Sequence, residues 1–205
     1  MFTGIVQGTA RVVAIEEKER FRTHALDMSM DQGDGLKPGA SVAHNGCCLT
    51  VTRVEGSVVF FDLMHETLRV TNLGDVGIGD RVNIERAARF GDEIGGHAMS
   101  GHIIDTARVT RIEPSENNYR VWFRVSKGLR KYIFTKGYIG IDGISLTVGE
   151  VEDGVFDVNL IPETLKRTNI GAREPGDRVN IEVDPQTQAI VDTVERVLAD
   201  RMALR

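Results

Sequence analysis

Several features are scarce in this sequence of 205 residues, and each scarcity excludes a class of protein. Its two cysteines, Cys47 and Cys48, are neighbours, so they are poorly placed to form a disulfide or to chelate a tetrahedral metal. No apolar stretch approaches the roughly 20 residues that cross a bilayer, and the start lacks the charged and long apolar regions of a signal peptide. We therefore expect a cytoplasmic protein with neither a disulfide framework nor a zinc site.

Strongly basic segments are also missing. The formal net charge is −5, whereas a protein that binds a phosphate backbone needs a basic face to displace counterions. Hydrophobic residues make up 41% of the chain and charged residues 27%, which is the balance of a soluble protein that can fill a core. Nucleic-acid binding and intrinsic disorder are therefore both disfavoured.

The most informative feature present is an internal repeat at a shift of 97 positions. Residues 45–51 align with 142–148, and residues 79–85 align with 176–182, without any gap between them. About half of the residues in 45–85 are identical to their counterparts, far above the level expected for unrelated residues of ordinary composition. Self-similarity at one fixed shift indicates a duplicated structural unit.

Each unit has the pattern of a β-barrel. Apolar residues alternate or form short β-branched runs separated by glycines, and strands at roughly 8 to 12 residue spacing suggest a sandwich or barrel. A closed Greek-key barrel would also remove exposed edges. The sequence thus predicts an all-β protein with two tandem duplicated Greek-key β-barrels followed by a C-terminal α-helix. Residues 130–134 and the two Glu-Thr-Leu segments are expected to form short helices.

The predicted domains are a first barrel over 1–97, a second barrel over 98–186 and a helix over 187–205. The helix has no counterpart in the first unit. Its apolar residues fall on one face: Ile190, Val191, Val194, Val197 and Leu198. This face fits either a lid on its own barrel or an oligomerisation helix, and the pattern alone favours neither.

Some polar residues occur in both copies, notably Thr50 with Thr147 and the Glu-Thr pairs at 66–67 and 163–164. Hydroxyls and carboxylates beside apolar residues could bind a polyhydroxylated ligand. However, threonine is an ordinary strand residue, and Glu-Thr before Leu can simply begin a helical turn. For any one of these residues, the pattern favours the structural interpretation.

Catalysis could instead use the positions at which the copies differ. Cys48 corresponds to Ser145, Ile5 to His102 and Ser41 to Tyr138. Cysteine can act as a nucleophile and histidine as a proton carrier.

The structural alternatives at these positions are a small buried side chain for Cys48 and an ordinary loop histidine at 102. Asp184 is expected to be a helix-cap or turn residue before Pro185. The glycines of 95–97 fit an interdomain junction or a turn.

Taken together, residues 1–6, 45–51, 95–97 and 140–148 resemble those of bacterial riboflavin synthases, and the resemblance spans the whole chain. It implies a transferase that catalyses the last step of riboflavin biosynthesis. In this dismutation a four-carbon unit passes between two molecules of 6,7-dimethyl-8-ribityllumazine, giving riboflavin and 5-amino-6-(D-ribitylamino)uracil. The resemblance implies no metal or organic cofactor.

The same resemblance implies a homotrimer held by the C-terminal helices, with each active site between the first barrel of one subunit and the second barrel of its neighbour. One lumazine would lie against Gly4, Ile5, Val6, Cys48, Leu49, Thr50, Asp62, Leu63, Met64, His65, Glu66 and Thr67. The other would lie against Gly101, His102, Ile103, Lys136, Ser145, Leu146, Thr147, Asn159, Leu160, Ile161, Pro162, Glu163 and Thr164. The candidate catalytic residues are Cys48, His102, Ser41, Ser145 and Asp184.

Three alternatives stay open. A lumazine- or flavin-binding antenna protein of the same fold would bind without turnover, although such relatives depart from the paired motifs kept here. A flavin-dependent reductase would need a nucleotide-binding domain with a Gly-rich strand-to-helix turn, and none follows the barrels. A purely structural duplicated barrel would leave the differences between the copies without a use.

Overall fold

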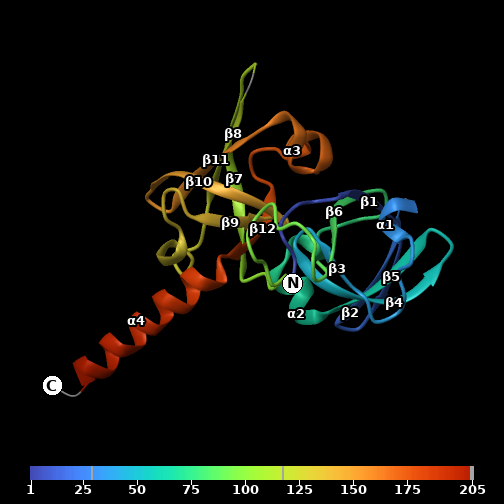
Figure 1. The fold of residues 1–205 in the computed structure, drawn as a ribbon, viewed down its shortest axis with the longest axis horizontal. Coiled ribbons are helices and arrows are strands. Elements are labelled where there is room, and N and C mark those ends of the chain that lie inside the picture. Colours follow the sequence, from blue (N-terminus) through green and yellow to red (C-terminus); the bar gives the residue numbers. More distant parts are fainter. Residues whose placement is uncertain (29, 117, 204–205) are drawn as a thin grey trace.

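The chain forms two closed six-stranded β-barrels followed by one long helix (Figure 1). The coordinates are a computed structural model that describes residues 1–28, 30–116 and 118–203. In this part of the chain no helix is long and apolar enough to cross a membrane. The predicted architecture of two β-barrels and a C-terminal helix is confirmed.

The first barrel has antiparallel strands in the order β1-β2-β5-β4-β3-β6. Its strands are β1 (Gly8–Lys18), β2 (Phe21–Asp27), β3 (Ser41–His44), β4 (Cys47–Glu55), β5 (Val58–Met64) and β6 (Arg81–Arg86). Three short helices join them: α1 (Met30–Gly33), α2 (His65–Val70) and the 3₁₀ turn η1 (Asn72–Gly74). Strand side chains alternate between a buried and an exposed face, so one face of each strand fills the barrel.

The second barrel repeats this order 97 positions later, with neighbours β10-β11-β8-β7-β12-β9. Its strands are β7 (Asp105–Pro114), β8 (Tyr119–Arg124), β9 (Tyr138–Ile141), β10 (Ile144–Glu152), β11 (Val155–Leu160) and β12 (Arg178–Val183). Its short helices are η2 (Arg130–Tyr132), α3 (Pro162–Arg167) and η3 (Ile170–Ala172). The expected short helices therefore form at η2, α2 and α3.

Tight turns explain why the Asn-Gly and Asp-Gly pairs occur at the same place in both copies. Asn45 and Gly46 connect β3 to β4 with φ of 44° and 80°, and Asp142 and Gly143 connect β9 to β10 with φ of 45° and 81°. A two-residue hairpin turn of type I′ needs positive φ at both positions, which favours Asn or Asp followed by Gly. The turns also touch, because a Cβ added to Gly46 would lie 2.6 Å from the backbone nitrogen of Gly143.

Helix α4 (Pro185–Ala203) projects away from both barrels in Figure 1. It begins two residues before the predicted boundary at 187. Lys131 binds Asp192 and Glu195, and Tyr132 donates to Asp192, which ties the first half of the helix to η2. No residue of the helix is buried, and Ile190 and Val194 are 65% and 51% exposed. The helix is therefore not a lid over its own barrel.

Candidate functional site

Each barrel is completed by a short segment that precedes the first strand of the other barrel. We call residues 4–6 and 101–103 the lead-in segments. The backbone N–H of Ser145 donates to the Gly4 carbonyl, and that of Cys48 donates to the Gly101 carbonyl, both at 2.9 Å. Val6 belongs to the core of the second barrel, while Ile103 packs against the core of the first.

Each lead-in segment thus packs on the barrel of the other copy, an arrangement that we call the crossover. It corrects the sequence-based assignment of these segments to the two sites. The prediction placed residues 4–6 beside Cys48, within one barrel, and residues 101–103 beside Ser145. In the structure residues 4–6 lie against Ser145, and residues 101–103 lie against Cys48. The sequence pattern shows which segments repeat, but it does not show which copy of a repeated segment closes which barrel.

Two buried glutamates hold the lead-in segments in place. Glu85 on β6 accepts hydrogen bonds from the backbone N–H groups of Thr3 and Gly4, at 2.6 and 3.0 Å. Glu182 on β12 accepts the equivalent bonds from Ser100 and Gly101, at 2.6 and 3.0 Å. Burial raises the pKa of both carboxyl groups, and these hydrogen bonds oppose that rise.

Sequence reasoning did not select these glutamates as site residues, although each ends the repeated segment at 79–85 or 176–182. The repeat of a carboxylate at the end of a buried strand could have identified them, because a buried carboxylate needs specific hydrogen-bond partners. We conclude that Glu85 and Glu182 position the lead-in segments.

The first site lies where β4 and β5 meet the lead-in segment at 101–103. Thr50 on β4 and Met64 at the end of β5 are exposed, and Cys48 is half-buried. His65, Glu66 and Thr67 follow in α2, where Glu66 pairs with Arg69 and Asp62 on β5 accepts from Thr23. Leu49 and Leu63 point into the barrel core, so their side chains shape the site without facing solvent.

The second site has the same construction around β10, β11 and the lead-in segment at 4–6. Thr147 and Asn159 are exposed on neighbouring strands, as are Ile161, Pro162 and Glu163 at the start of α3, while Thr164 is half-buried. Lys136 is also exposed, and its backbone N–H donates to the Val148 carbonyl at 2.9 Å. Leu146 and Leu160 point into the core, as their counterparts do in the first barrel.

The second site also contains His97, which the sequence analysis treated only as part of a junction. Its Nδ1 lies 2.7 Å from the Ser145 Oγ, and its ring stacks on Tyr138 with centroids 5.1 Å apart. Burial lowers the pKa of His97, and the nearby Asp184 carboxylate partly opposes this. A neutral imidazole within hydrogen-bond reach of a hydroxyl can accept or hold its proton.

No repeated motif in the sequence pointed to the His97–Ser145 pair. The linker has no counterpart in the first copy, and the two residues are 48 positions apart in the chain.

The remaining candidates occupy different places. His102 is exposed on the lead-in segment beside Cys48 and is one of the charges that act on Glu182. Ser41 lies opposite Thr50 in the β3–β4 pair. Asp184 accepts from the backbone N–H of Thr187 at 2.9 Å at the start of α4, which confirms its expected capping role and also places it near His97.

The two neighbouring thiols differ in environment. Cys47 is buried, and burial, reinforced by Cys48 and Glu182, raises its pKa to about 12. Its thiolate is therefore negligible at neutral pH. Cys48 is half-buried and faces Gly101, so it is the thiol that a bound molecule could reach.

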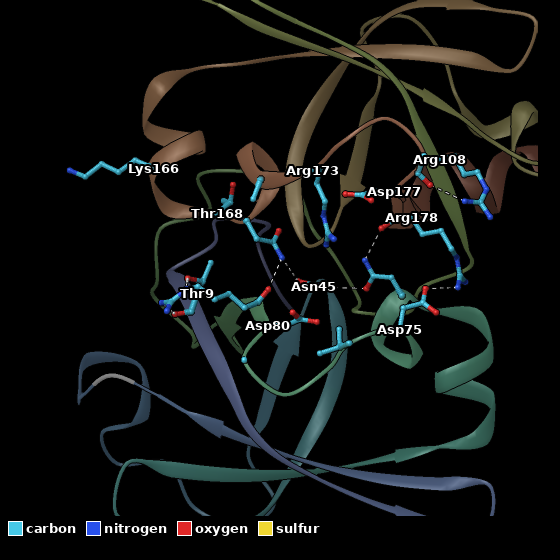
Figure 2. Close-up of a pocket in the computed structure, with 17 residues that line it drawn as sticks. Thr9, Asn45, Asp75, Asp80, Arg108, Lys166, Thr168, Arg173, Asp177 and Arg178 are labelled. Carbon is cyan, nitrogen blue, oxygen red and sulfur yellow. Dashed lines mark hydrogen bonds and ion pairs between the residues drawn. The ribbon is translucent and has the colours of Figure 1, made fainter.

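A cleft of about 820 Å³ lies at the seam between the barrels (Figure 2). Its floor is a buried polar network in which the two copies bind each other reciprocally. The backbone N–H of Asn72 donates to Asn180 Oδ1 at 2.6 Å, and that of Asn169 donates to Asn83 Oδ1 at 2.7 Å. The predicted site residues do not line this cleft, so the network serves to fix the barrels against each other.

Among the residues that the structure describes, no group of three or more His, Cys, Asp or Glu side chains could hold a metal ion. The chemistry that the two sites offer is that of hydroxyls, one accessible thiol, imidazoles and carboxylates.

Tandem antiparallel barrels with two similar polar sites define a protein of the lumazine-binding class. The family model described as "Lumazine binding domain" matches residues 3–87 and 100–184. The solved structure of LumP complexed with riboflavin superposes with a TM-score of 0.85 at 32% identity, over 90% of this chain and 100% of that chain. LumP complexed with 6,7-dimethyl-8-(1'-D-ribityl) lumazine gives 0.83 at 30% identity, over 90% and 99%.

Sequence relatives narrow the class. Riboflavin synthase of Escherichia coli (strain K12) is 66% identical over 98% of this chain and 95% of its own length. Riboflavin synthase of Chlamydia pneumoniae is 46% identical over 97% and 98%. The chain belongs to the riboflavin synthase family of enzymes, as its motifs predicted.

Proposed function

We propose that this enzyme converts two molecules of 6,7-dimethyl-8-ribityllumazine into riboflavin and 5-amino-6-(D-ribitylamino)uracil. The observation that carries the proposal is the pair of similar sites, one on each barrel, in a chain 66% identical to a riboflavin synthase. Donor and acceptor are the same compound in this reaction, so two similar sites suit it. The atoms of two substrate molecules equal those of the two products, and the reaction therefore needs no net oxidant, reductant or water.

Binding is assigned to the residues that recur in both copies. Thr50 and Thr147 present hydroxyls on equivalent strands, and α2 and α3 begin at equivalent ends of β5 and β11. These groups would bind ribityl hydroxyls and the pyrimidine edge through donor and acceptor pairs. Positioning two bound reactants supplies a large part of the barrier reduction, up to about 7–11 kcal/mol in well-oriented intramolecular models.

Proton transfer is assigned to groups that differ between the copies. The C7 methyl group of one lumazine must lose a proton, and a nucleophile adds to the other lumazine to activate it. His102 is the candidate proton carrier of the first site, with Cys48 beside it as candidate nucleophile. In the second site Ser145 is the candidate nucleophile. His97 would exchange a proton with it, and Asp184 would act as an electrostatic helper. Ser41, at the start of β3, pairs with Thr50 across the β3–β4 ladder. It would help to orient the ligand by positioning Thr50.

We further propose a homotrimer in which the first barrel of one subunit faces the second barrel of its neighbour. The exposed apolar face of α4 supports this assembly, because a large exposed apolar patch marks an interaction surface. In such a trimer the donor and acceptor would lie on different subunits.

The decisive experiment mixes the purified enzyme with 6,7-dimethyl-8-ribityllumazine without added cofactor and follows both products by chromatography. We expect one riboflavin and one uracil product for every two lumazines consumed. Tight binding of lumazine without turnover would instead assign the chain to ligand-binding proteins, whose fold LumP shares. The absence of both binding and turnover would refute the proposal.

The accessible thiol can be tested separately with Cys48→Ala, using Cys47→Ala as the matched control. We expect Cys48→Ala to lower kcat by at least tenfold while lumazine still binds, because the accessible thiol is the one that reacts. Turnover near the wild-type rate would show that Cys48 only contacts ligand.

A further inference from the structure

The seam cleft shown in Figure 2 contains cationic groups that nothing in the two lumazine sites uses. It is lined by three carboxylates, Asp75, Asp80 and Asp177, and by five cationic side chains, Arg81, Arg108, Lys166, Arg173 and Arg178. The whole chain carries a net charge of −5, so this local excess of cations runs against the overall balance.

The duplication supplies an internal comparison between the two ends of this cleft. At one end Arg178 on β12 donates from Nε to Thr106 Oγ1 at 3.3 Å, and its Nη1 donates to Asp75 Oδ2 at 2.7 Å. This end therefore has an arginine held by a threonine and neutralised by a carboxylate from the other barrel. Figure 2 shows the contact between Asp75 and Arg178 across the seam.

At the other end the same arrangement lacks its carboxylate. Arg81 on β6 corresponds to Arg178, and its Nε donates to Thr9 Oγ1 at 2.8 Å, as in the other copy. The counterpart of Asp75 is Ala172, an exposed residue that lines the same cleft. The Arg81 guanidinium also donates from Nη2 to the Thr9 carbonyl at 3.0 Å, and it has no acidic partner among the described residues.

Two further cations of the second barrel line the same cleft. Lys166 of α3 reaches out from the second barrel on the Thr9 side of the seam (Figure 2) and forms no ion pair among the described residues. Arg173 follows Ala172 in the chain; its Nη2 binds Asp142, and its Nε is buried without a hydrogen-bond partner in the described part of the structure.

From this missing carboxylate we propose a second kind of binding site: an oxyanion of the phosphate class binds the Arg81 guanidinium, at the position that Asp75 occupies in the other copy. The planar guanidinium fork matches the geometry of phosphate oxygens, and Lys166 adds a point charge from the opposite barrel. The anion would join the barrels as the Arg178–Asp75 pair does. The chemistry fits free phosphate and the phosphate group of a small metabolite equally.

The test is isothermal titration calorimetry of the full-length protein with inorganic phosphate at constant ionic strength. We expect saturable binding of one phosphate per chain. Ala172→Asp restores the missing carboxylate and should weaken binding at least tenfold, as should Arg81→Gln. Asp75→Ala frees Arg178 and should raise the stoichiometry to two. Arg124→Gln, which alters an exposed arginine outside the cleft, should leave binding unchanged.

A repeat of the titration with ribose 5-phosphate identifies the source of the anion. A higher affinity than for inorganic phosphate means that the site takes a phosphorylated metabolite, and an equal affinity means that it takes the free ion; both support the site. The proposal is overturned if wild-type protein shows no saturable binding, or if Ala172→Asp and Asp75→Ala both bind phosphate as the wild type does. Circular dichroism of each variant checks that it is folded.

Discussion

At the scale of single residues, the first barrel contains two buried histidines that the second barrel does not have. His24 and His44 are fully buried, and His44 packs edge-on against Phe61 with ring centroids 4.1 Å apart. Neither ring nitrogen of either histidine has a hydrogen-bond partner among the described residues. The equivalent positions in the second barrel are Val121 and Ile141.

These histidines predict a loss of stability in acid. Burial lowers the pKa of His24 to about 4, with help from Arg22, and lowers the pKa of His44 to about 3, with help from His24. The unfolded chain protonates both near pH 6.5, so it binds more protons than the folded state below that pH. The free energy of unfolding should therefore fall by about 1.4 kcal/mol per pH unit for each histidine as pH drops from 6.5 towards 4.

Urea unfolding between pH 7 and pH 4.5 measures this effect. The variant His24→Val/His44→Ile copies the residues of the second barrel and should flatten the dependence over this range. An unchanged pH slope in a folded variant would show that other groups cause the acid sensitivity.

The His97–Ser145 pair leads to a second prediction at this scale. If His97 holds the proton of the Ser145 hydroxyl, His97→Gln and Ser145→Ala should each lower kcat about 10²-fold with a smaller change in KM. The double variant should be little slower than either single one, because residues that act as a unit are not additive. Steady-state kinetics measure these changes in kcat. If the losses of the two single variants add fully in the double variant, the two residues act independently.

At the scale of elements, the two hairpin turns at the seam lie in close contact with each other. Gly46→Ala would place a Cβ 2.6 Å from the Gly143 nitrogen in addition to the strain at positive φ. Gly56 is the matched control, since it also has positive φ but has open space around its Cβ position.

We expect Gly56→Ala to lower the free energy of unfolding by about 1–2 kcal/mol, the strain cost alone. Gly46→Ala should cost at least twice as much. Chemical denaturation distinguishes the outcomes, and equal costs would mean that the barrels separate easily at the seam.

The elements were predictable from sequence to different degrees. The repeat and the alternating apolar residues predicted the two barrels, and the helical spacing after Pro185 predicted α4. The Asn-Gly and Asp-Gly turns also carry local chemistry that can be read directly.

The crossover of the lead-in segments could not be predicted, because residues 4–6 and 101–103 are nearly equivalent and fit either barrel by pattern alone. The His97–Ser145 contact was missed for a related reason: it joins a linker to a distant strand, and no periodicity records such a contact. The sequence thus gives local structure and repeated motifs, whereas the partners of repeated segments depend on tertiary packing.

At the scale of the whole molecule, α4 is the element through which assembly can be tested. Its exposed face includes Val194 and Val197, which are 51% and 45% exposed. We expect Val194→Asp/Val197→Asp to convert a trimer into monomers and to abolish turnover, because a complete site would need two subunits.

Analytical ultracentrifugation and product assays follow the two effects together. Asp200→Asn, on the same helix, should change neither. Monomers of the double variant that turn over at the wild-type rate would contradict the proposed assembly.

The crossed lead-in segments also have a consequence for the order in which the protein is made on the ribosome. The first barrel emerges before residues 101–103 have been synthesised, so Ile103 cannot yet pack against its core. Val6 is exposed at this stage, because the core of the second barrel, against which it packs, does not yet exist. At about 5–20 residues per second, this unfinished stage lasts for several seconds. Nascent chains should therefore depend on chaperones that bind apolar segments until β10 has left the exit tunnel, and only then can both halves close together.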